Sequence, residues 1–223
     1  MSGSRLVVIA GTGTEIGKTH FAEALLRALS TRHGRVLGLK PIESGLLQPT
    51  ASDSARLERA STFHVEPFGY SFAEPLSPHL AARRSGTVID LEPLVAAIDA
   101  IRTEADVVVL ELPGGLFTPL SDTVVNADFA RDLDPDLTLL AAPDRLGVLN
   151  DVLSALRAAE TVPLPIGGII LVTPERRDLS TGHNGPELRR LVPIPLAVTL
   201  PRSEVDELVH HDAIAEVVSL ITS

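Results

Sequence analysis

The chain has 223 residues, 44% of them hydrophobic and none of them cysteine, which favours one sizeable core and excludes disulfides, thiol catalysis and cysteine-bound metals. A net charge of −10 disfavours a protein held to nucleic acid mainly by phosphate contacts, and no apolar run approaches the roughly 20 residues of a membrane span. We therefore expect one cytoplasmic domain over residues 1–223 that binds neither nucleic acid nor a membrane.

Short apolar runs alternate with segments of helical periodicity along the chain. In order, we expect a strand at 6–10, a helix at 18–33 ended by Gly34, a strand at 36–39, short helices near 53–61 and 78–84, a helix at 91–103, strands at 107–110 and 137–141, a helix at 146–159, a strand at 169–172, a helix at 186–191, a strand at 196–200 and a helix at 204–221. The strands are continuous apolar runs, which predicts an α/β fold with a parallel sheet covered by helices on both faces. The proline-rich stretch 41–90 is expected to be an elaborated connection.

The segment GTGTEIGKT lies between the first expected strand and the first expected helix. It is similar to the phosphate-binding pattern G-x-x-x-x-G-K-[ST], but five residues rather than four separate Gly11 from Gly17. A strand that aims the loop and a helix that begins after it offer free N–H groups and a positive dipole end to phosphate. Lys18 can reach the outer phosphates, and Thr19 can offer its hydroxyl to Mg²⁺. The alternative is a glycine-rich turn with an incidental Gly-Lys-Thr.

Three further polar residues occupy positions that suit an active site. Lys40 follows the strand at 36–39, at the sheet edge where ligands gather, although such a lysine is also often a surface residue. Glu111 ends the strongest apolar run before Pro-Gly-Gly, which suits a Mg²⁺ ligand as well as a solvated strand end. Asp53 is a candidate second Mg²⁺ ligand, but a Ser-Asp pair before an apolar-periodic run also caps helices.

Taken together, these segments resemble the dethiobiotin synthetases, whose phosphate-binding loop, GTDTxxGKT, is also one residue longer than usual. The resemblance extends over most of the chain. It is carried, in the family's order and spacing, by GTGTEIGKT, KPIESG, the Ser-Asp pair at 52–53, FAEPLSPH at 72–79, GGLFTPLSDT at 114–123 and RLGVLN at 145–150. The FAEPLSPH and GGLFTPLSDT runs are long and specific, so chance agreement at all six places is not credible.

The resemblance implies a P-loop enzyme that converts 7,8-diaminononanoate, CO₂ and ATP to dethiobiotin, ADP and phosphate. A carbamate formed on one amine attacks the γ-phosphate to give a carbamic–phosphoric anhydride, and the second amine then closes the ureido ring. By position in the motifs, Lys18 and Lys40 flank the transferred phosphoryl group and the carbamate as catalytic residues. Thr19, Asp53 and Glu111 are expected to hold Mg²⁺.

The resemblance also implies binding residues for both substrates. The residues expected to bind ATP and its metal are Gly13, Thr14, Glu15, Ile16, Gly17, Lys18, Thr19, His20, Asp53, Glu111, Gly114, Pro201, Arg202 and Ser203. The diamine is expected to meet Ser44, and its distant carboxylate to meet the helix start at Gly147, Val148 and Asn150 of the partner subunit. We therefore expect a homodimer with active sites at the interface, although Asn150 taken alone suits a surface position.

Three places depart from the family's pattern. Gly13 stands where the family usually has Asp, and ELPGG, with Leu112 and Pro113, stands where it usually has EGAGG. Val172 and Thr173 replace an Asn-Asp pair whose Asn reads the adenine edge. Because a valine side chain has no hydrogen-bonding group, we expect weak discrimination among nucleotide bases.

Two other functions remain to be weighed. One is a ligase of the same P-loop branch that acts on a different carboxylate, which FAEPLSPH and GGLFTPLSDT argue against. The other is a nucleotide-switch ATPase of the partition or septum-positioning type. Such proteins typically have an additional lysine early in the loop and a basic or amphipathic surface, whereas no lysine precedes Lys18 here and the net charge is −10. His79, within FAEPLSPH, has no assigned role.

Overall fold

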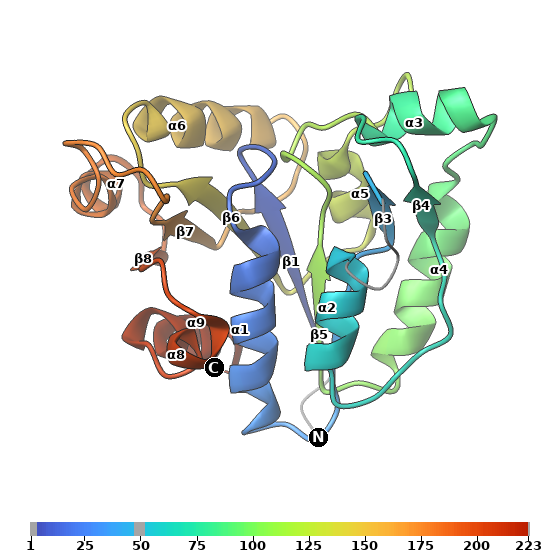
Figure 1. The fold of residues 1–223 in the computed structure, drawn as a ribbon, viewed down its shortest axis with the longest axis horizontal. Coiled ribbons are helices and arrows are strands. Elements are labelled where there is room, and N and C mark those ends of the chain that lie inside the picture. Colours follow the sequence, from blue (N-terminus) through green and yellow to red (C-terminus); the bar gives the residue numbers. More distant parts are fainter. Residues whose placement is uncertain (1–3, 47–51, 223) are drawn as a thin grey trace.

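The computed structural model describes residues 4–46 and 52–222. At its centre lies a six-stranded parallel sheet in the order β2-β5-β1-β6-β7-β8 (Figure 1). Its strands are β1 (Arg5–Gly11), β2 (Val36–Leu39), β5 (Val107–Glu111), β6 (Leu137–Pro143), β7 (Gly168–Val172) and β8 (Leu196–Leu200). The six strands predicted from apolar runs are these six, so the predicted parallel α/β sheet is confirmed.

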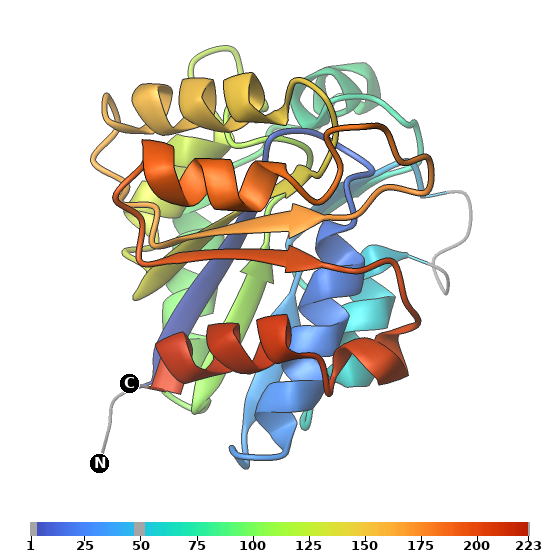
Figure 2. The same cartoon turned by 90° about the vertical axis from the view of Figure 1, so that its left-hand side faces the viewer.

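Helices cover both faces of the sheet. One face carries α4 (Leu91–Arg102), α5 (Asn126–Asp132), α6 (Val148–Ala159) and α7 (Asn184–Leu191), and the other carries α1 (Lys18–Ser30), α2 (Asp53–Ala60), α8 (Val205–Leu208) and α9 (Asp212–Thr222). Figure 2 shows α6 and α7 on one side of β7 and β8, with α9 on the other. Along β1, Leu6 and Val8 point into one core while Val7 and Ile9 point into the other. Burial on both faces explains the continuous apolar runs.

The proline-rich stretch contains elements that the sequence pattern did not predict. These are β3 (Ile42–Ser44) and β4 (Tyr70–Phe72), which form a separate two-stranded parallel sheet. The helix predicted at 78–84 is α3 (Pro78–Ser85), and it packs against both strands. Strands of three residues are too short to show a periodicity. The seven-residue helix α5 was missed for the same reason.

The expectation of one helix over 204–221 is wrong, because α8 ends at Leu208 and α9 begins only at Asp212. The amides of His210 and His211 donate to Glu207 O and Leu208 O, which are the short bonds of a tightened last turn. His211 Nδ1 then accepts a hydrogen bond from Ala213 N at 3.1 Å. The imidazole thus satisfies a free amide at the start of α9, a role that helical periodicity does not reveal.

Other predicted helix ends shift by one to three residues, and α7 begins at Asn184 rather than at residue 186. α6 begins at Val148 rather than at residue 146, because Gly147 has a left-handed φ of 95° that a helix cannot contain. α1 ends at Ser30 rather than at residue 33. In the part of the chain that the structure describes, no helix has the length and apolarity to cross a membrane.

The parallel sheet brings the predicted functional residues to one edge. β1 leads into the loop at 12–17, β2 is followed by Lys40, and β5 ends at Glu111. Because all six strands run in the same direction, these positions lie together at their carboxyl ends. This edge is where open α/β sheets bind ligands.

Candidate active site

The P-loop, residues 11–19, joins β1 to α1 in a backbone shape that requires small residues. Gly17 has a φ of 90°, and a Cβ added there would lie 2.9 Å from Val172 Cγ1. Glu15 also has a left-handed φ, of 55°, which is uncommon outside glycine. Lys18 Nζ donates to Gly13 O at 2.8 Å, so the lysine lies back along the loop. Burial lowers the pKa of Lys18 to about 8, although the negative charge of Glu111 acts in the opposite direction.

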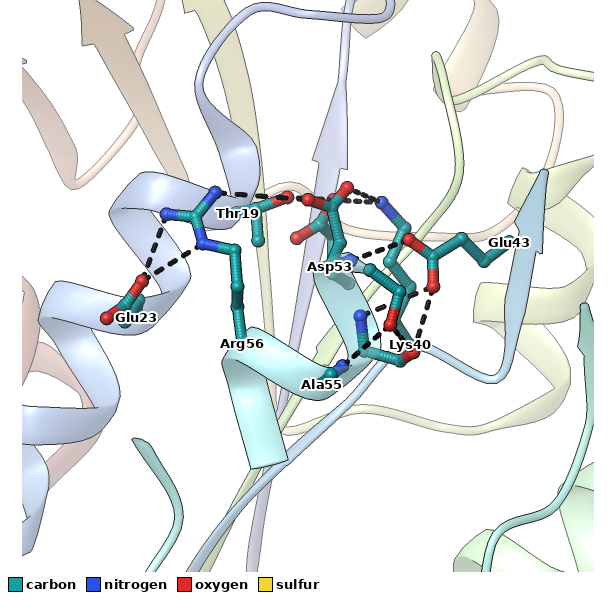
Figure 3. Close-up of polar contacts among 10 residues, drawn as sticks. Thr19, Glu23, Lys40, Glu43, Asp53, Ala55 and Arg56 are labelled. Atoms are coloured by element: carbon teal, nitrogen blue, oxygen red, sulfur yellow. Dashed lines mark hydrogen bonds and ion pairs between the residues drawn. The ribbon is translucent and has the colours of Figure 1, made fainter. Parts of the chain in front are cut away.

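A cluster of charges lies beside the P-loop, in which Lys40 and Glu111 are nearly buried and Asp53 is partly exposed (Figure 3). Lys40 Nζ lies 2.5 Å from Asp53 Oδ2 and 2.8 Å from Glu111 Oε1. Thr19 Oγ1 donates to the same Glu111 oxygen at 3.0 Å. The cluster therefore unites four residues that the sequence analysis placed around one metal and one phosphoryl group.

The electrostatics of this cluster favour the ionised forms of Lys40 and Asp53. Burial alone would lower the pKa of Lys40, but the charges of Glu111 and Asp53 outweigh it and hold the pKa above its ordinary value. Burial would likewise raise the pKa of Asp53, but the Lys40 ammonium outweighs that effect and holds the pKa below its ordinary value. The site thus presents an ammonium group between two carboxylates.

The oxygen atoms of this cluster suit Mg²⁺. Glu111 is 1% exposed, and its Oε2 has no hydrogen-bond partner among the described residues. A buried carboxylate oxygen without a donor is costly, and a bound cation would satisfy it. Across residues 4–46 and 52–222 no group of three His, Cys, Asp or Glu side chains forms a metal site by itself. Mg²⁺ commonly uses only one or two carboxylates together with substrate phosphates, so Asp53, Glu111 and the Thr19 hydroxyl fit this ion.

Two cavities lie on either side of the P-loop. The first, of about 750 Å³, is lined by the P-loop residues Glu15, Ile16 and Gly17 together with His20, Val172, Thr173, Pro201, Arg202 and Ser203. The second, of about 910 Å³, is lined by Gly13, Thr14, Glu15, Ser44, Gly114 and Asn150 among others. Glu15 belongs to both walls, so the P-loop separates the two cavities.

The structure brings together most of the residues expected to bind the substrates. Of the predicted nucleotide-binding residues, Glu15, Ile16, Gly17, His20 and Pro201–Ser203 line the first cavity. Gly13 and Thr14 line the second cavity instead, and Lys18 and Thr19 line neither. Val172 faces the first cavity beside Gly17. Ser44 lines the second cavity and donates to Leu76 O at 2.7 Å. Gly114, with a φ of 63°, lies on the same wall.

The helix start expected to bind the diamine carboxylate is only partly at the second cavity. Asn150 lines it, whereas the Val148 side chain is fully buried in the core and Gly147 lies outside the lining. The cavity is lined by Asn150 of the same chain that supplies the P-loop. The contribution of a partner subunit stays a prediction.

Sequence reasoning missed three buried polar residues that hold the site in place. Asn126 Nδ2 donates to Pro113 O and Gly115 O, at 2.5 and 2.8 Å, and so fixes the loop after β5. Asp144 accepts from Gly182 N and from Asn184 Nδ2, at 2.8 and 2.7 Å, and so ties the β7–α7 connection to the end of β6. Glu43 binds the start of α2. In the sequence, these residues show only as polar residues beside apolar runs. Such a pattern does not reveal that the side chain binds backbone groups of a distant segment.

Known proteins similar to this chain fall into two groups. A family model described as an AAA domain matches residues 5–209. The chain is 38% identical to the ATP-dependent dethiobiotin synthetase BioD of Ralstonia nicotianae, covering 87% of each protein. It is 36% identical to the BioD of Aromatoleum aromaticum, covering 90% of this chain and 92% of the relative, and 34% identical to BioD 1 of Salmonella typhi, covering 86% and 87%.

Solved structures with a similar fold include proteins of other functions. The septum site-determining protein MinD of Pyrococcus horikoshii, complexed with Mg-ADP, aligns with a TM-score of 0.61 and 16% identity over 98% of this chain and 94% of that one. A ParA family ATPase of Chlorobium tepidum aligns with a TM-score of 0.57 and 15% identity over 96% and 92%. At these identities the likeness concerns the fold, and the switch-ATPase alternative has no closer support. The sequence relatives decide the matter, and the chain belongs to the dethiobiotin synthetase family.

Proposed function

We propose that this chain catalyses the reaction of its family, the ATP-dependent closure of the dethiobiotin ureido ring from 7,8-diaminononanoate and CO₂. The observation that carries the proposal is the pair of cavities separated only by the P-loop. A nucleotide in the first cavity and a diamine in the second would meet at the phosphate-binding backbone. That is the geometry required for a carbamate oxygen to attack a γ-phosphate.

The P-loop and the start of α1 are the proposed phosphate site. The free N–H groups of this helix terminus and the ammonium of Lys18 would bind the phosphates, even though the protein as a whole is acidic. The nucleoside would extend into the first cavity towards Val172 and Pro201–Ser203. Among the described residues that line this cavity, Thr173 is the one buried polar residue, which supports a weak preference among bases.

Thr19, Asp53 and Glu111 are the proposed Mg²⁺ ligands. When bound, the ion would neutralise part of the phosphate charge. Lys40 contacts both carboxylates, so its ammonium is held beside the position of the transferred phosphoryl group. We assign Lys40 and Lys18 the stabilisation of negative charge on the carbamate and in the transition state.

The second cavity is the proposed diamine site. Ser44, the loop held by Asn126 and the exposed polar end of α6 at Asn150 surround it. The attacking amine must be uncharged, because an ammonium has no lone pair for CO₂. Our proposal includes a homodimer, and a cytoplasmic location where ATP is available.

The deciding test is phosphate release from ATP and Mg²⁺, with and without diaminononanoate and bicarbonate. We expect release to require both, with a product that gains the mass of CO less two hydrogens relative to the diamine. Phosphate release at the same rate without the diamine would contradict the synthetase activity and would favour a switch ATPase.

A further inference from the structure

Asp53 is placed at the first residue of α2, so its position depends on where this helix begins. Ser52 caps the helix by accepting from Ala55 N at 3.1 Å. This contact lies within the helix start and does not connect it to the sheet. Lys40 holds the Asp53 side chain beside Glu111, and a separate contact holds the Asp53 backbone at the start of α2.

Glu43 of β3 provides such a contact (Figure 3). Its Oε1 accepts from Asp53 N at 2.7 Å, and its Oε2 accepts from Ser54 Oγ at 2.9 Å and from Ser54 N at 3.3 Å. Glu43 is 5% exposed. A buried carboxylate that accepts the first amide groups of a helix also interacts favourably with the helix dipole.

The strand that carries Glu43 also carries a residue of the second cavity. Successive side chains of a strand point to opposite faces. Glu43 points to the start of α2, and the next residue, Ser44, lines the second cavity. β3 thereby connects the proposed metal ligand to the proposed diamine site.

A second brace acts on the same helix from α1. Glu23 Oε2 accepts from Arg56 Nη2 at 2.9 Å and from its Nε at 3.2 Å, and Arg56 Nη1 lies 3.9 Å from Asp53 Oδ1. This brace meets α2 one turn further along and touches Asp53 only at long range. Glu43 is the contact at the Asp53 backbone itself.

We propose that Glu43 is a positioning residue that sets the geometry of the Mg²⁺ site by holding the Asp53 backbone. This inference rests on the proposed role of Asp53 as a Mg²⁺ ligand. Glu43→Gln keeps the size of the side chain but replaces one of the two acceptor oxygens with an NH₂ group, which cannot accept from Asp53 N or Ser54 N. It also removes the charge at the start of α2.

The test measures Mn²⁺ binding by electron paramagnetic resonance, in the presence of a non-hydrolysable ATP analogue. We expect Glu43→Gln to raise the dissociation constant for Mn²⁺ about tenfold, as loss of a residue that orients a metal ligand typically does. Ser54→Ala, which removes only the hydroxyl contact to Glu43, should move the constant in the same direction by less. Asp90→Asn is the matched control, because Asp90 caps α4 by accepting from Glu92 N at 3.2 Å and belongs to no part of the site. It should change the melting temperature but not Mn²⁺ binding.

Two results would overturn the inference and are distinguishable by Asp53→Asn. If Asp53→Asn weakens Mn²⁺ binding while folded Glu43→Gln binds Mn²⁺ like the unaltered protein, Glu43 has no positioning role and the proposed function stands. If Asp53→Asn also binds Mn²⁺ normally, the proposed metal site itself is wrong, and the role of Glu43 is lost with it.

Discussion

The proposed phosphoryl-transfer centre, which is Lys40 with Asp53 and Glu111, differs in construction from the proposed base end of the first cavity, which is the wall around Val172 and Pro201–Ser203. At the centre, charges are buried and paired, with the Lys40 and Glu111 side chains 9% and 1% exposed. At the base end, the ion pair of Arg202 with Glu175 spans 3.7 Å between side chains that are 60% and 84% exposed. A buried charge cannot be altered without a large cost, whereas an exposed pair contributes little. If these assignments hold, we expect substitutions at the proposed centre to cost more activity than substitutions at the proposed base end.

The largest effect should come from Lys40→Met at the centre. Loss of the ammonium removes charge stabilisation from the transition state, and we expect kcat to fall about a thousandfold. It also leaves Glu111 and Asp53 without their cation, which should lower the free energy of unfolding by about 3 kcal/mol. Steady-state kinetics and urea unfolding measure the two effects.

The double variant Lys40→Met/Glu111→Gln separates these two losses. It should recover most of the stability, since the buried carboxylate is gone, and none of the activity. A kcat for Lys40→Met within tenfold of the unaltered enzyme would remove Lys40 from the transition state.

The next largest effect is expected on the selectivity of the enzyme among ATP, CTP and GTP. The unaltered enzyme should use CTP and GTP with kcat/KM values within about a hundredfold of that for ATP, because Val172 offers no hydrogen bond at the cavity wall. Val172→Asn restores the amide that the family pattern has there, and should increase the preference for ATP severalfold. Competition assays with the three nucleotides measure the ratio.

Val172→Ala is the matched control for this change. It alters the size of the side chain without adding a polar group, so it should leave the preference unchanged. Strong preference for ATP in the unaltered enzyme would mean that other groups of this cavity wall, such as Thr173 or Ser203, read the base.

A smaller effect is expected from Gly13→Asp, which restores the usual residue of the family loop. A Cβ at Gly13 meets nothing within 4 Å, and its φ is not left-handed, so the substitution should be accommodated without strain. A residue with less freedom than glycine should also stabilise the loop, by up to about 1 kcal/mol. We expect an unchanged or slightly higher melting temperature and a severalfold higher kcat/KM for ATP. Gly13→Ala is the control, because it restricts the backbone in the same way without adding a charge. A lower melting temperature for Gly13→Asp would contradict the absence of a steric clash at this position.

The smallest expected effect is a change in stability from Asp178, which lies in the connection between β7 and α7. Asp178 accepts from Leu146 N and Ser180 N, at 2.8 and 2.7 Å, and these contacts lower its pKa to about 2. Because the pKa is lower in the folded state than the ordinary value near 3.9, this contribution to stability is present above pH 4 and is lost as the pH falls towards 2. The difference in melting temperature between the unaltered protein and Asp178→Asn should therefore shrink from pH 5 to pH 2. Calorimetry that finds a constant difference would contradict this linkage.

The sequence allowed the sheet and the centre of the site to be predicted for one physical reason. Apolar runs mark strands that are buried on both faces, and parallel strands place their last residues at one edge, so Lys40 and Glu111 had to lie near the P-loop. The break at His211 and the bonds of Asn126 depend on contacts with particular backbone atoms, which no periodicity encodes. The single domain and the partner's helix start remain predictions.

Glu15 has a consequence for inhibitors of this enzyme. Its left-handed backbone stands in the wall that separates the two cavities, and one residue is all that the two linings share. A bivalent compound with a nucleotide-like head and a diamine-like tail would need only a short linker to pass this residue. Tethering makes the second binding event intramolecular, at an effective concentration of about millimolar for short linkers. Two weak ligands joined across Glu15 should therefore bind far more tightly than either alone.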